Sequence, residues 1–446
     1  MILRSLQRSF ASFLFILSCA VEILPASSIE QVQQEPTSEE DSKTARRQDE
    51  IRDEPGTTTA SPNSLADGYL RTMRDRWGFS LGLVQFYTSD LTISTKEKEA
   101  ATFTSLQSRI FAKPIQSSRS ELWLNYGLGY RAYNRGKEPN NFEHSGTASL
   151  NYRLSTKNSI HVSDVFSSVF NEDGFSDNSL TPAPYEPDFA QQIHLGRERL
   201  TTNSLVVGLE RRLSRGSNID VFSNYEFWRN GNTKLRDTHS VQTGMAIQYQ
   251  IKKWLILNSA YTDYLTTVND ASGESSASIH RLRVGELRFR FRRTVELSFG
   301  PEVESTRHMG IWRTAAGFQS VVSKKSESTW LSLLYHRGFS TAVGPGAIFD
   351  GDYVTALFNR WLSRRINFQL SSIYIRGSSF EDSSLRYITA RAGLGIAVQD
   401  HTLVSVHYSY LSQHTTNLPV NALNVSRYTV ATGLQYSLPS LRQRQR

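Results

Sequence analysis

The sequence predicts an all-β protein, a transmembrane antiparallel up-and-down β-barrel of about 18 strands, with 16 strands as the alternative. Short stretches of alternating apolar and polar residues recur between Trp77 and Leu438, as expected for strands with one apolar face. The segments between these stretches alternate between tight turns and longer polar loops, which is typical of a barrel whose two rims face different compartments. Beyond the N-terminal segment, no apolar run is long enough for a transmembrane helix.

Residues 1–28 have the pattern of a secretory signal peptide. Arg4 and Arg8 precede the short apolar run Phe10–Leu17, and small residues follow it. Cys19, the single cysteine of the chain, follows two residues after this run. Two interpretations of Cys19 remain open: a lipid-acylated first residue of the mature chain, or a residue that is removed with the signal peptide.

Residues 29–70 are predicted to form a disordered polar periplasmic tether. They are rich in Glu, Asp, Gln, Ser, Thr and Pro and contain too few apolar side chains to form a core. Residues 1–70 hold 6 basic and 11 acidic side chains, which leaves 44 basic and 31 acidic ones, a net charge of about +13, for residues 71–446. Such an acidic tether could bind a periplasmic partner.

Residues 71–438 are predicted to form the transmembrane β-barrel itself. In Leu122–Tyr130 the even positions are bulky and apolar, whereas most odd positions are polar or glycine, and Ile388–Val398 follows a similar alternation. Successive strand side chains point to opposite faces, so one face of each strand is apolar. Because only every second residue must be apolar over about 9–11 residues, the mean hydropathy of −0.41 is compatible with a membrane barrel.

Nine longer loops and eight tight turns place both ends of the barrel on the rim of the tight turns. In bacterial outer-membrane barrels this rim faces the periplasm. The sequence therefore predicts a protein of the bacterial cell outer membrane, surrounded by outer-membrane lipid. Tyrosines near the predicted strand ends, such as Tyr130, Tyr249 and Tyr436, fit the aromatic girdles of such barrels, although tyrosine is also a good strand former.

The face opposite to the lipid is predicted to line a water-filled pore. Charged residues are tolerated there, whereas a charge on the outer face at mid-bilayer costs about 2–4 kcal/mol. By strand alternation we assign to the pore lining Arg109, Arg131, Arg153, Arg212, Arg288, Arg290, Arg313, Arg391 and Arg427, together with Glu296, Glu302 and Glu304.

One predicted hairpin concentrates these charges. Arg288, Arg290 and Arg292 alternate on its first strand, and the three glutamates just named lie on its second. Two interpretations remain open. The charges form cross-strand ion pairs that brace the wall, or unpaired guanidinium groups attract anions.

The longest connection, residues 171–197, is predicted to be the third outer loop. In general porins the third loop folds inward and narrows the channel, and this position makes the segment a candidate constriction loop. A mobile outer loop is the alternative. In the constricted arrangement, acidic groups would face the lumenal arginines: Glu172, Asp173, Asp177, Glu186 and Asp188.

The last predicted strand, Tyr428–Leu438, places bulky residues at alternate positions and contains a glycine. This pattern resembles the final-strand signal of the outer-membrane barrel assembly machinery, which we therefore expect as a partner. The strand departs from the usual signal because it ends in Leu438 instead of phenylalanine. A basic C-terminal tail, residues 439–446, follows it.

On this architecture and final-strand pattern, residues 77–438 resemble bacterial outer-membrane porin-like barrels, in particular the β-barrel porin family associated with exopolysaccharide systems. The resemblance implies a channel. We expect porin-like passive diffusion of small, anionic solutes. The alternative is a dedicated outer-membrane pore for secretion of an anionic exopolysaccharide.

No sequence pattern indicates an enzyme, a cofactor, a metal site or a nucleic-acid partner. We find no nucleotide-binding loop, dinucleotide fingerprint or metal-ligand cluster in the sequence. His336 and His407 are expected in the lumen, but no spacing supplies a nucleophile, a base and an orienting partner together. We therefore expect a protein that is not an enzyme.

Overall fold

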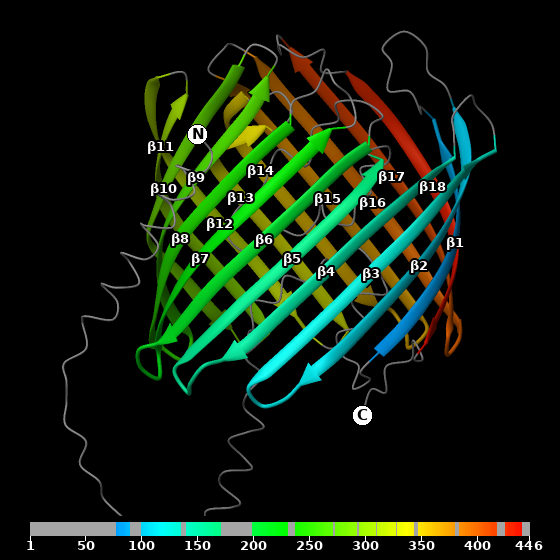
Figure 1. The fold of residues 1–446 in the computed structure, drawn as a ribbon, viewed down its shortest axis with the longest axis horizontal. Coiled ribbons are helices and arrows are strands. Elements are labelled where there is room, and N and C mark those ends of the chain that lie inside the picture. Colours follow the sequence, from blue (N-terminus) through cyan, green and yellow to red (C-terminus); the bar gives the residue numbers. More distant parts are fainter. Residues whose placement is uncertain are drawn as a thin grey trace, which may run out of the picture. The chain divides into compact units, whose positions relative to one another are not determined.

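Eighteen tilted strands form a closed barrel in the computed structural model of the protein (Figure 1). The structure describes residues 77–89, 100–134, 140–170, 199–230, 237–270, 273–291, 294–308, 310–326, 328–342, 347–379, 383–416 and 424–438. The predictions for the signal peptide, the tether, the constriction loop and the basic tail concern residues outside these ranges.

The strands follow one another along the chain. They are β1 Trp77–Thr88, β2 Ala101–Gln116, β3 Ser120–Tyr133, β4 Asn141–Arg153, β5 Asn158–Phe170, β6 Arg199–Arg212, β7 Ser217–Asn230, β8 Asp237–Lys252, β9 Leu255–Asp270, β10 Gly273–Phe291, β11 Val295–His308, β12 Ile311–Lys325, β13 Thr329–Ala342, β14 Ala347–Trp361, β15 Ile366–Ser379, β16 Ser384–Gln399, β17 Thr402–Thr416 and β18 Val425–Leu438.

Each strand pairs antiparallel with the next, and β1 pairs with β18 to close the barrel. The closing register runs from Phe79 opposite Leu438 to Thr88 opposite Thr429. Closure leaves no free edge at this seam, which satisfies the backbone hydrogen bonds of both terminal strands. The predicted fold class is confirmed, with 18 strands and not 16. Among the described residues, no helix is long and apolar enough to cross a membrane.

The two rims differ in the length of their connections. At the rim that holds both ends of the strand region, two to four residues join successive strands; we call it the short-turn rim. At the opposite, long-loop rim the connections range from two residues to the segment 171–198. Two of the nine longer loops that the sequence predicts span Thr266–Ser278 and Ser340–Asp350. Both are shorter in the structure, because β9, β10, β13 and β14 extend into them. Polar residues that end long strands look like loop residues in the sequence.

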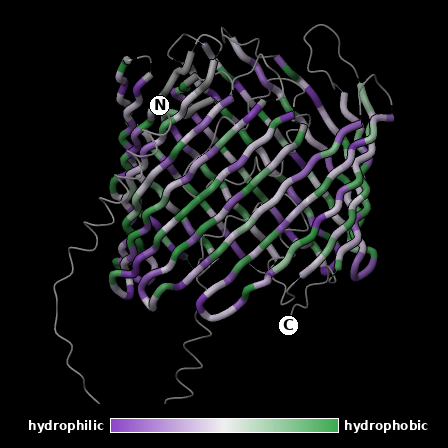
Figure 2. The backbone as a smooth tube through the Cα atoms, viewed as in Figure 1, coloured by the Kyte–Doolittle hydropathy of each residue, from purple (hydrophilic) through white to green (hydrophobic). Residues whose placement is uncertain are grey.

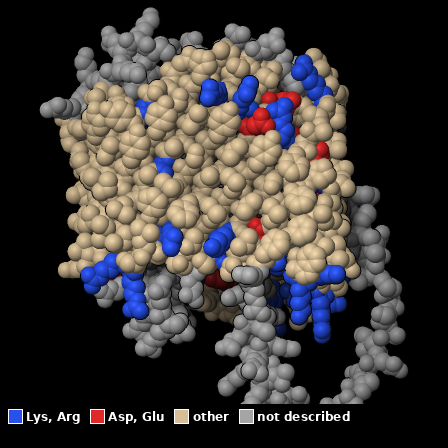
Figure 3. Space-filling model, turned by 180° about the vertical axis from the view of Figure 1, so that it is seen from behind, with Lys and Arg blue, Asp and Glu red and all other residues tan. Residues whose placement is uncertain are grey.

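Hydrophobic and hydrophilic residues alternate along the strands (Figure 2), and this alternation gives the wall two different faces. Along β1 and β18 the outward residues are bulky and exposed, for example Leu83 (50%) and Leu434 (51%), whereas the inward Phe103 of β2 is fully buried. From behind, the outer wall is mainly uncharged, and most Lys and Arg side chains lie toward its upper and lower edges (Figure 3). An apolar, unpartnered outer face requires a lipid environment.

A β-bulge interrupts β10. Its register with β9 and β11 shifts by one residue after Arg283, and Gly285 in the bulge has a φ of 71°. Glycine adopts this left-handed conformation without the steric cost that other residues bear. The extra residue changes which side chains of β10 face inward, and this determines the charge pairing described below.

The pairing of β12 with β13 ends halfway up the wall. Its last pair is Phe318 opposite Arg337, whereas β13 and β14 remain paired to Ala342 opposite Ala347. We call Gly338–Ala342 and Ala347–Gly351 the inner hairpin. The β13 part of the inner hairpin no longer pairs with β12. The backbone groups on that edge of β13 therefore need other hydrogen-bond partners.

Hydrophobic contacts place the inner hairpin inside the barrel. Phe339 and Ile348 pack in one buried cluster with Tyr264, Ala277 and Ile279, which are inner-face residues of β9 and β10. Phe349 of the same hairpin belongs to a second cluster, whose other members come from β14 to β18: Tyr353, Ile373, Ile375, Leu385, Tyr387, Leu411 and Val425. The inner hairpin therefore occupies part of the lumen toward the long-loop rim.

Candidate functional site on the inner face of the barrel

A buried network of five ionisable side chains lies beneath the inner hairpin. Arg281 and Arg283 project from β10, Glu302 and Glu304 from β11, and His336 from β13. Each is at most 7% exposed. Cross-strand register brings them together, because Arg281 stands opposite Glu304 and Arg283 opposite Glu302.

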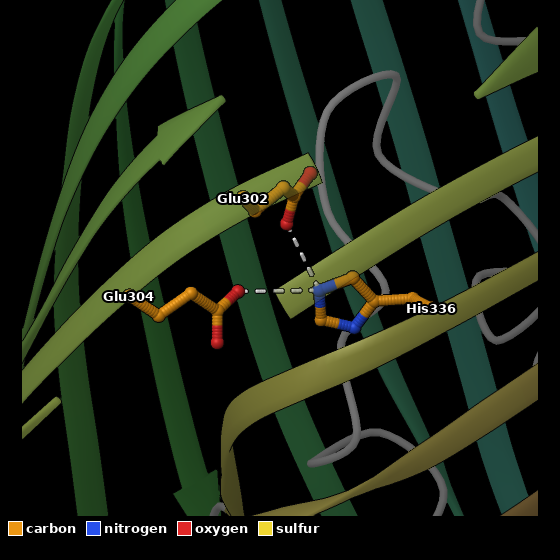
Figure 4. Close-up of side chains that lie close together, drawn as sticks. All are labelled: Glu302, Glu304 and His336. Atoms are coloured by element: carbon orange, nitrogen blue, oxygen red, sulfur yellow. Dashed lines mark hydrogen bonds and ion pairs between the residues drawn. The ribbon is translucent and has the colours of Figure 1, made fainter. Parts of the chain in front are cut away.

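The two arginines pair with the two glutamates. Arg281 Nε forms an ion pair with Glu304 Oε1 and lies 3.5 Å from Glu302 Oε2, and Arg283 binds Glu302. His336 Nε2 lies 3.3 Å from a carboxylate oxygen of each glutamate, as the close-up shows (Figure 4). Arg283 also lies 3.5 Å from the carboxylate of Glu286, a further buried residue of β10. The guanidinium groups and the histidine therefore stand beside the buried carboxylates, which offsets the cost of burying their charge in a low-dielectric site.

The network also holds the inner hairpin. The backbone N–H of Phe339 donates a hydrogen bond to Glu304 Oε2, and Arg281 Nη2 donates to the carbonyl oxygen of Phe339 at 2.9 Å. Gly338 lies against the Glu304 carboxylate so closely that a Cβ atom on Gly338 would overlap it. Side chains of β10 and β11 thus replace β12 as hydrogen-bond partners of the departing β13 backbone.

Glu302, Glu304 and His336 could in principle hold a metal ion, since one ligand atom of each lies within 4.8 Å of the others. Both carboxylates already pair with guanidinium groups. A cation would have to compete with these two fixed positive charges, so the donor set fits an ion-pair network better than a metal site. The sequence analysis predicted that His336 faces the lumen, but it did not predict that Glu302 and Glu304 are its partners.

The strand registers place the described pore-lining candidates on the inward-alternating positions. Arg131 pairs with Glu143 at 2.9 Å, and Arg288 and Arg290 approach Glu296 at 3.1 and 3.5 Å. Inward by register are Arg109, Arg131, Arg153, Arg212, Arg288, Arg290, Arg313, Arg391, Arg427, Glu296, Glu302 and Glu304. Arg292 and the five acidic residues of the segment 171–197 lie outside the described residues.

The charged hairpin of β10 and β11 has other ion-pair partners than the sequence predicts. The sequence placed Arg288, Arg290 and Arg292 on one strand and Glu296, Glu302 and Glu304 on the next. Arg290 does stand opposite Glu296, but Arg281 and Arg283 are the partners of Glu304 and Glu302. Sequence reasoning missed both arginines because the bulge at Gly285 reverses the alternation within one strand. A lone glycine inside a strand pattern is the signal that could have indicated it.

The charge on the wall is uneven around the barrel. In β15 to β18, β1 and β2, six neighbouring strands, no residue is Asp or Glu. Their inner faces carry Arg427 near the long-loop rim and Arg391 and Arg109 nearer the middle of their strands. We call this part of the lumen the cationic wall. The carboxylates of the described inner face lie on other strands, where many pair with arginine.

The wall as a whole belongs in a membrane. Its outer face is apolar, its strands close on themselves, and an even number of strands brings both ends to one rim. Closed barrels are the strand-built structures that satisfy every backbone group in lipid, and even-numbered antiparallel barrels of this size are those of the bacterial outer membrane. The predicted location in the bacterial outer membrane is confirmed.

No family model matches the chain, and no curated protein matches its sequence. Among solved structures, the chain is similar to the FrpB iron transporter from Neisseria meningitidis, with 8% identity, 84% of each chain covered and a TM-score of 0.43. It is also similar to OccAB4 from Acinetobacter baumannii (11% identity, 81% of this chain and 98% of that chain, TM-score 0.41) and to the outer membrane protein OpdK from Pseudomonas aeruginosa (9%, 81% and 98%, 0.41).

Proposed function

We propose that the protein is an outer-membrane channel for the passive diffusion of small anionic solutes. The observation that carries this proposal is the cationic wall, where six neighbouring strands carry inward arginines and contain no acidic residue. Arg109 and Arg391 are partly exposed on this wall, and Arg427 adds a buried positive charge. Rings and stripes of lumenal arginine select for anions in water-filled pores. The paired charges on β10 and β11 stiffen the opposite side of the lumen and contribute little net potential.

The inner hairpin sets the width of the proposed channel. It packs against the inner face of β9 and β10 through Phe339 and Ile348, and toward β15 to β18 through Phe349. Because the hairpin packs against β15 to β18, a solute would pass beside it through the rest of the lumen, and this narrowed passage suits small solutes. We also propose that the segment 171–197 narrows the channel as a constriction loop. Its acidic residues would then face the lumenal arginines: Glu172, Asp173, Asp177, Glu186 and Asp188.

Single-channel recording of the refolded full-length protein in a planar bilayer tests the proposal. We expect stable, small conductance steps in KCl, and permeation of small anions in a vesicle-swelling assay at a higher rate than neutral sugars of equal size. A correctly folded barrel that gives neither steps nor swelling would contradict a diffusion channel. Steps that a soluble anionic polysaccharide blocks from the short-turn side alone would favour the alternative, a pore for secretion of such a polymer.

A further inference from the structure

Three basic side chains form a row across the outer wall near the long-loop rim. Arg376 of β15 stands directly opposite Arg386 of β16, and Arg386 stands directly opposite His414 of β17. All three are exposed, and they alternate with the buried inner-face residues Ile375 and Leu385. We call Arg376, Arg386 and His414 the outer basic row.

The outer basic row has no partner within the described part of the protein. None of its three side chains forms a hydrogen bond or an ion pair with another described residue. The nearest candidate carboxylate, Asp352, stands opposite Arg376 on β14. It instead accepts a hydrogen bond from the Tyr335 hydroxyl at 2.9 Å and pairs with Arg337 at 3.2 Å.

Such a row is unfavourable without an anion. Side chains directly opposite each other on antiparallel strands have Cβ atoms about 4.5–5.5 Å apart, and like charges in this arrangement destabilise the sheet. Two guanidinium groups at this spacing can bind one phosphate or two neighbouring phosphates through paired N–H donors. The geometry therefore fits a bound phosphorylated group better than an empty surface.

Neighbouring tyrosines fix the depth of the row in the membrane. Tyr374 lies two residues below Arg376 on the same face, and Tyr410 stands opposite Tyr428 on β17 and β18. Tyrosines of barrel girdles lie at the boundary between hydrocarbon and headgroups. The outer basic row, one step closer to the long-loop rim, then lies at the level of the lipid headgroups of the outer leaflet.

We propose that the outer basic row binds the phosphate groups of a phosphorylated glycolipid in the outer leaflet of the outer membrane. This inference depends on the location of the barrel and not on its proposed transport activity. Arg376 and Arg386 would hold the phosphates in a bidentate manner, and His414 would extend the site along the row.

The test uses the refolded full-length protein in detergent with diphosphoryl lipid A as the probe, and native mass spectrometry to count bound lipid. We expect the double variant Arg376→Gln/Arg386→Gln to bind diphosphoryl lipid A about tenfold more weakly than the wild type. The matched control is Arg360→Gln, an exposed outward arginine of β14 near the short-turn rim. It should bind the lipid as the wild type does.

Three results would overturn the proposal. Equal affinity of the double variant and the wild type would exclude these arginines. Equal binding of dephosphorylated lipid A would exclude phosphate recognition. Inorganic phosphate that binds alone, and loses this binding in the double variant, would assign the row to a free anion and not to a lipid. If the double variant does not fold, the single variant Arg386→Gln, measured in the same way, provides the test.

Discussion

The carboxylate of Glu304 accepts a hydrogen bond from the backbone N–H of Phe339, although β11 and β13 are not neighbours in the wall. Arg281, the ion-pair partner of Glu304, donates to the carbonyl oxygen of the same residue. These two side chains satisfy backbone groups that β12 would satisfy in a regular barrel. A buried ion pair thus replaces part of a β-ladder and fixes a hairpin inside the lumen.

Removing the carboxylate charge should loosen the inner hairpin. In Glu304→Gln, Arg281 loses its closest counter-charge while it remains buried, which typically costs about 3 kcal/mol or more in unfolding free energy. Urea unfolding in lipid vesicles measures this loss. The control is Glu121→Gln at the Lys113–Glu121 pair, where the Glu121 side chain is 45% exposed and the expected loss is about 0–1 kcal/mol. Equal losses in the two variants would show that the network does not hold the hairpin.

A methyl group at Gly338 should disturb the same contact. In Gly338→Ala the new Cβ atom would overlap the Glu304 carboxylate, so the hairpin or Glu304 must move. We expect a loss of about 1–3 kcal/mol in unfolding free energy, as for other overpacked sites. Gly82→Ala is the matched control, because the nearest atom to its new Cβ would lie at an ordinary 3.9 Å. A Gly338→Ala protein as stable as Gly82→Ala would contradict the close approach.

Truncation of Phe339 should free the hairpin without changing any charge. Phe339 is 2% exposed, and Phe339→Ala would remove its side chain from the cluster with Tyr264 and Ile279. We expect larger or noisier single-channel currents together with a loss of about 3–5 kcal/mol in unfolding free energy. Leu434→Ala, on the outer face, should leave the current unchanged. Identical currents in the wild type, Phe339→Ala and Leu434→Ala would mean that the hairpin does not limit the passage of ions.

The bulge in β10 should tolerate asparagine better than alanine. Gly285 has a φ of 71°, and alanine in this conformation costs roughly 1–2 kcal/mol, whereas asparagine is accepted more readily. Unfolding of Gly285→Ala and Gly285→Asn measures the difference. Two equally stable variants would argue against a left-handed residue at this position.

The alternation of apolar and polar residues was sufficient to predict the barrel and the number of its strands. Alternation records only which face is apolar, and every strand of a closed barrel obeys it. It therefore assigned faces to Arg131, Arg391 and Arg427 that agree with the observed register. It could not predict the departure of β13 from β12, since Phe339 and Ile348 alternate as wall residues do.

The charge partners were harder to predict than the faces. Pairing across strands depends on register. Without the extra residue at Gly285, Val284 and Leu282 would stand opposite Glu302 and Glu304, where the bulge places Arg283 and Arg281. The contact of Glu304 with Phe339 joins strands that are not adjacent. No local pattern in a sequence contains this information.

The most direct test of the cationic wall is the reversal potential across a KCl gradient. It compares the wild type with the triple variant Arg109→Gln/Arg391→Gln/Arg427→Gln, and the control is Arg360→Gln, which changes an arginine on the outer face. We predict anion selectivity in the wild type and the control, and a shift toward cation selectivity in the triple variant. The triple variant removes the inward arginines from the wall that holds no carboxylate, whereas the arginines of β10 are paired with glutamates. A conducting triple variant with the wild-type reversal potential would contradict the assignment of the anion path to this wall.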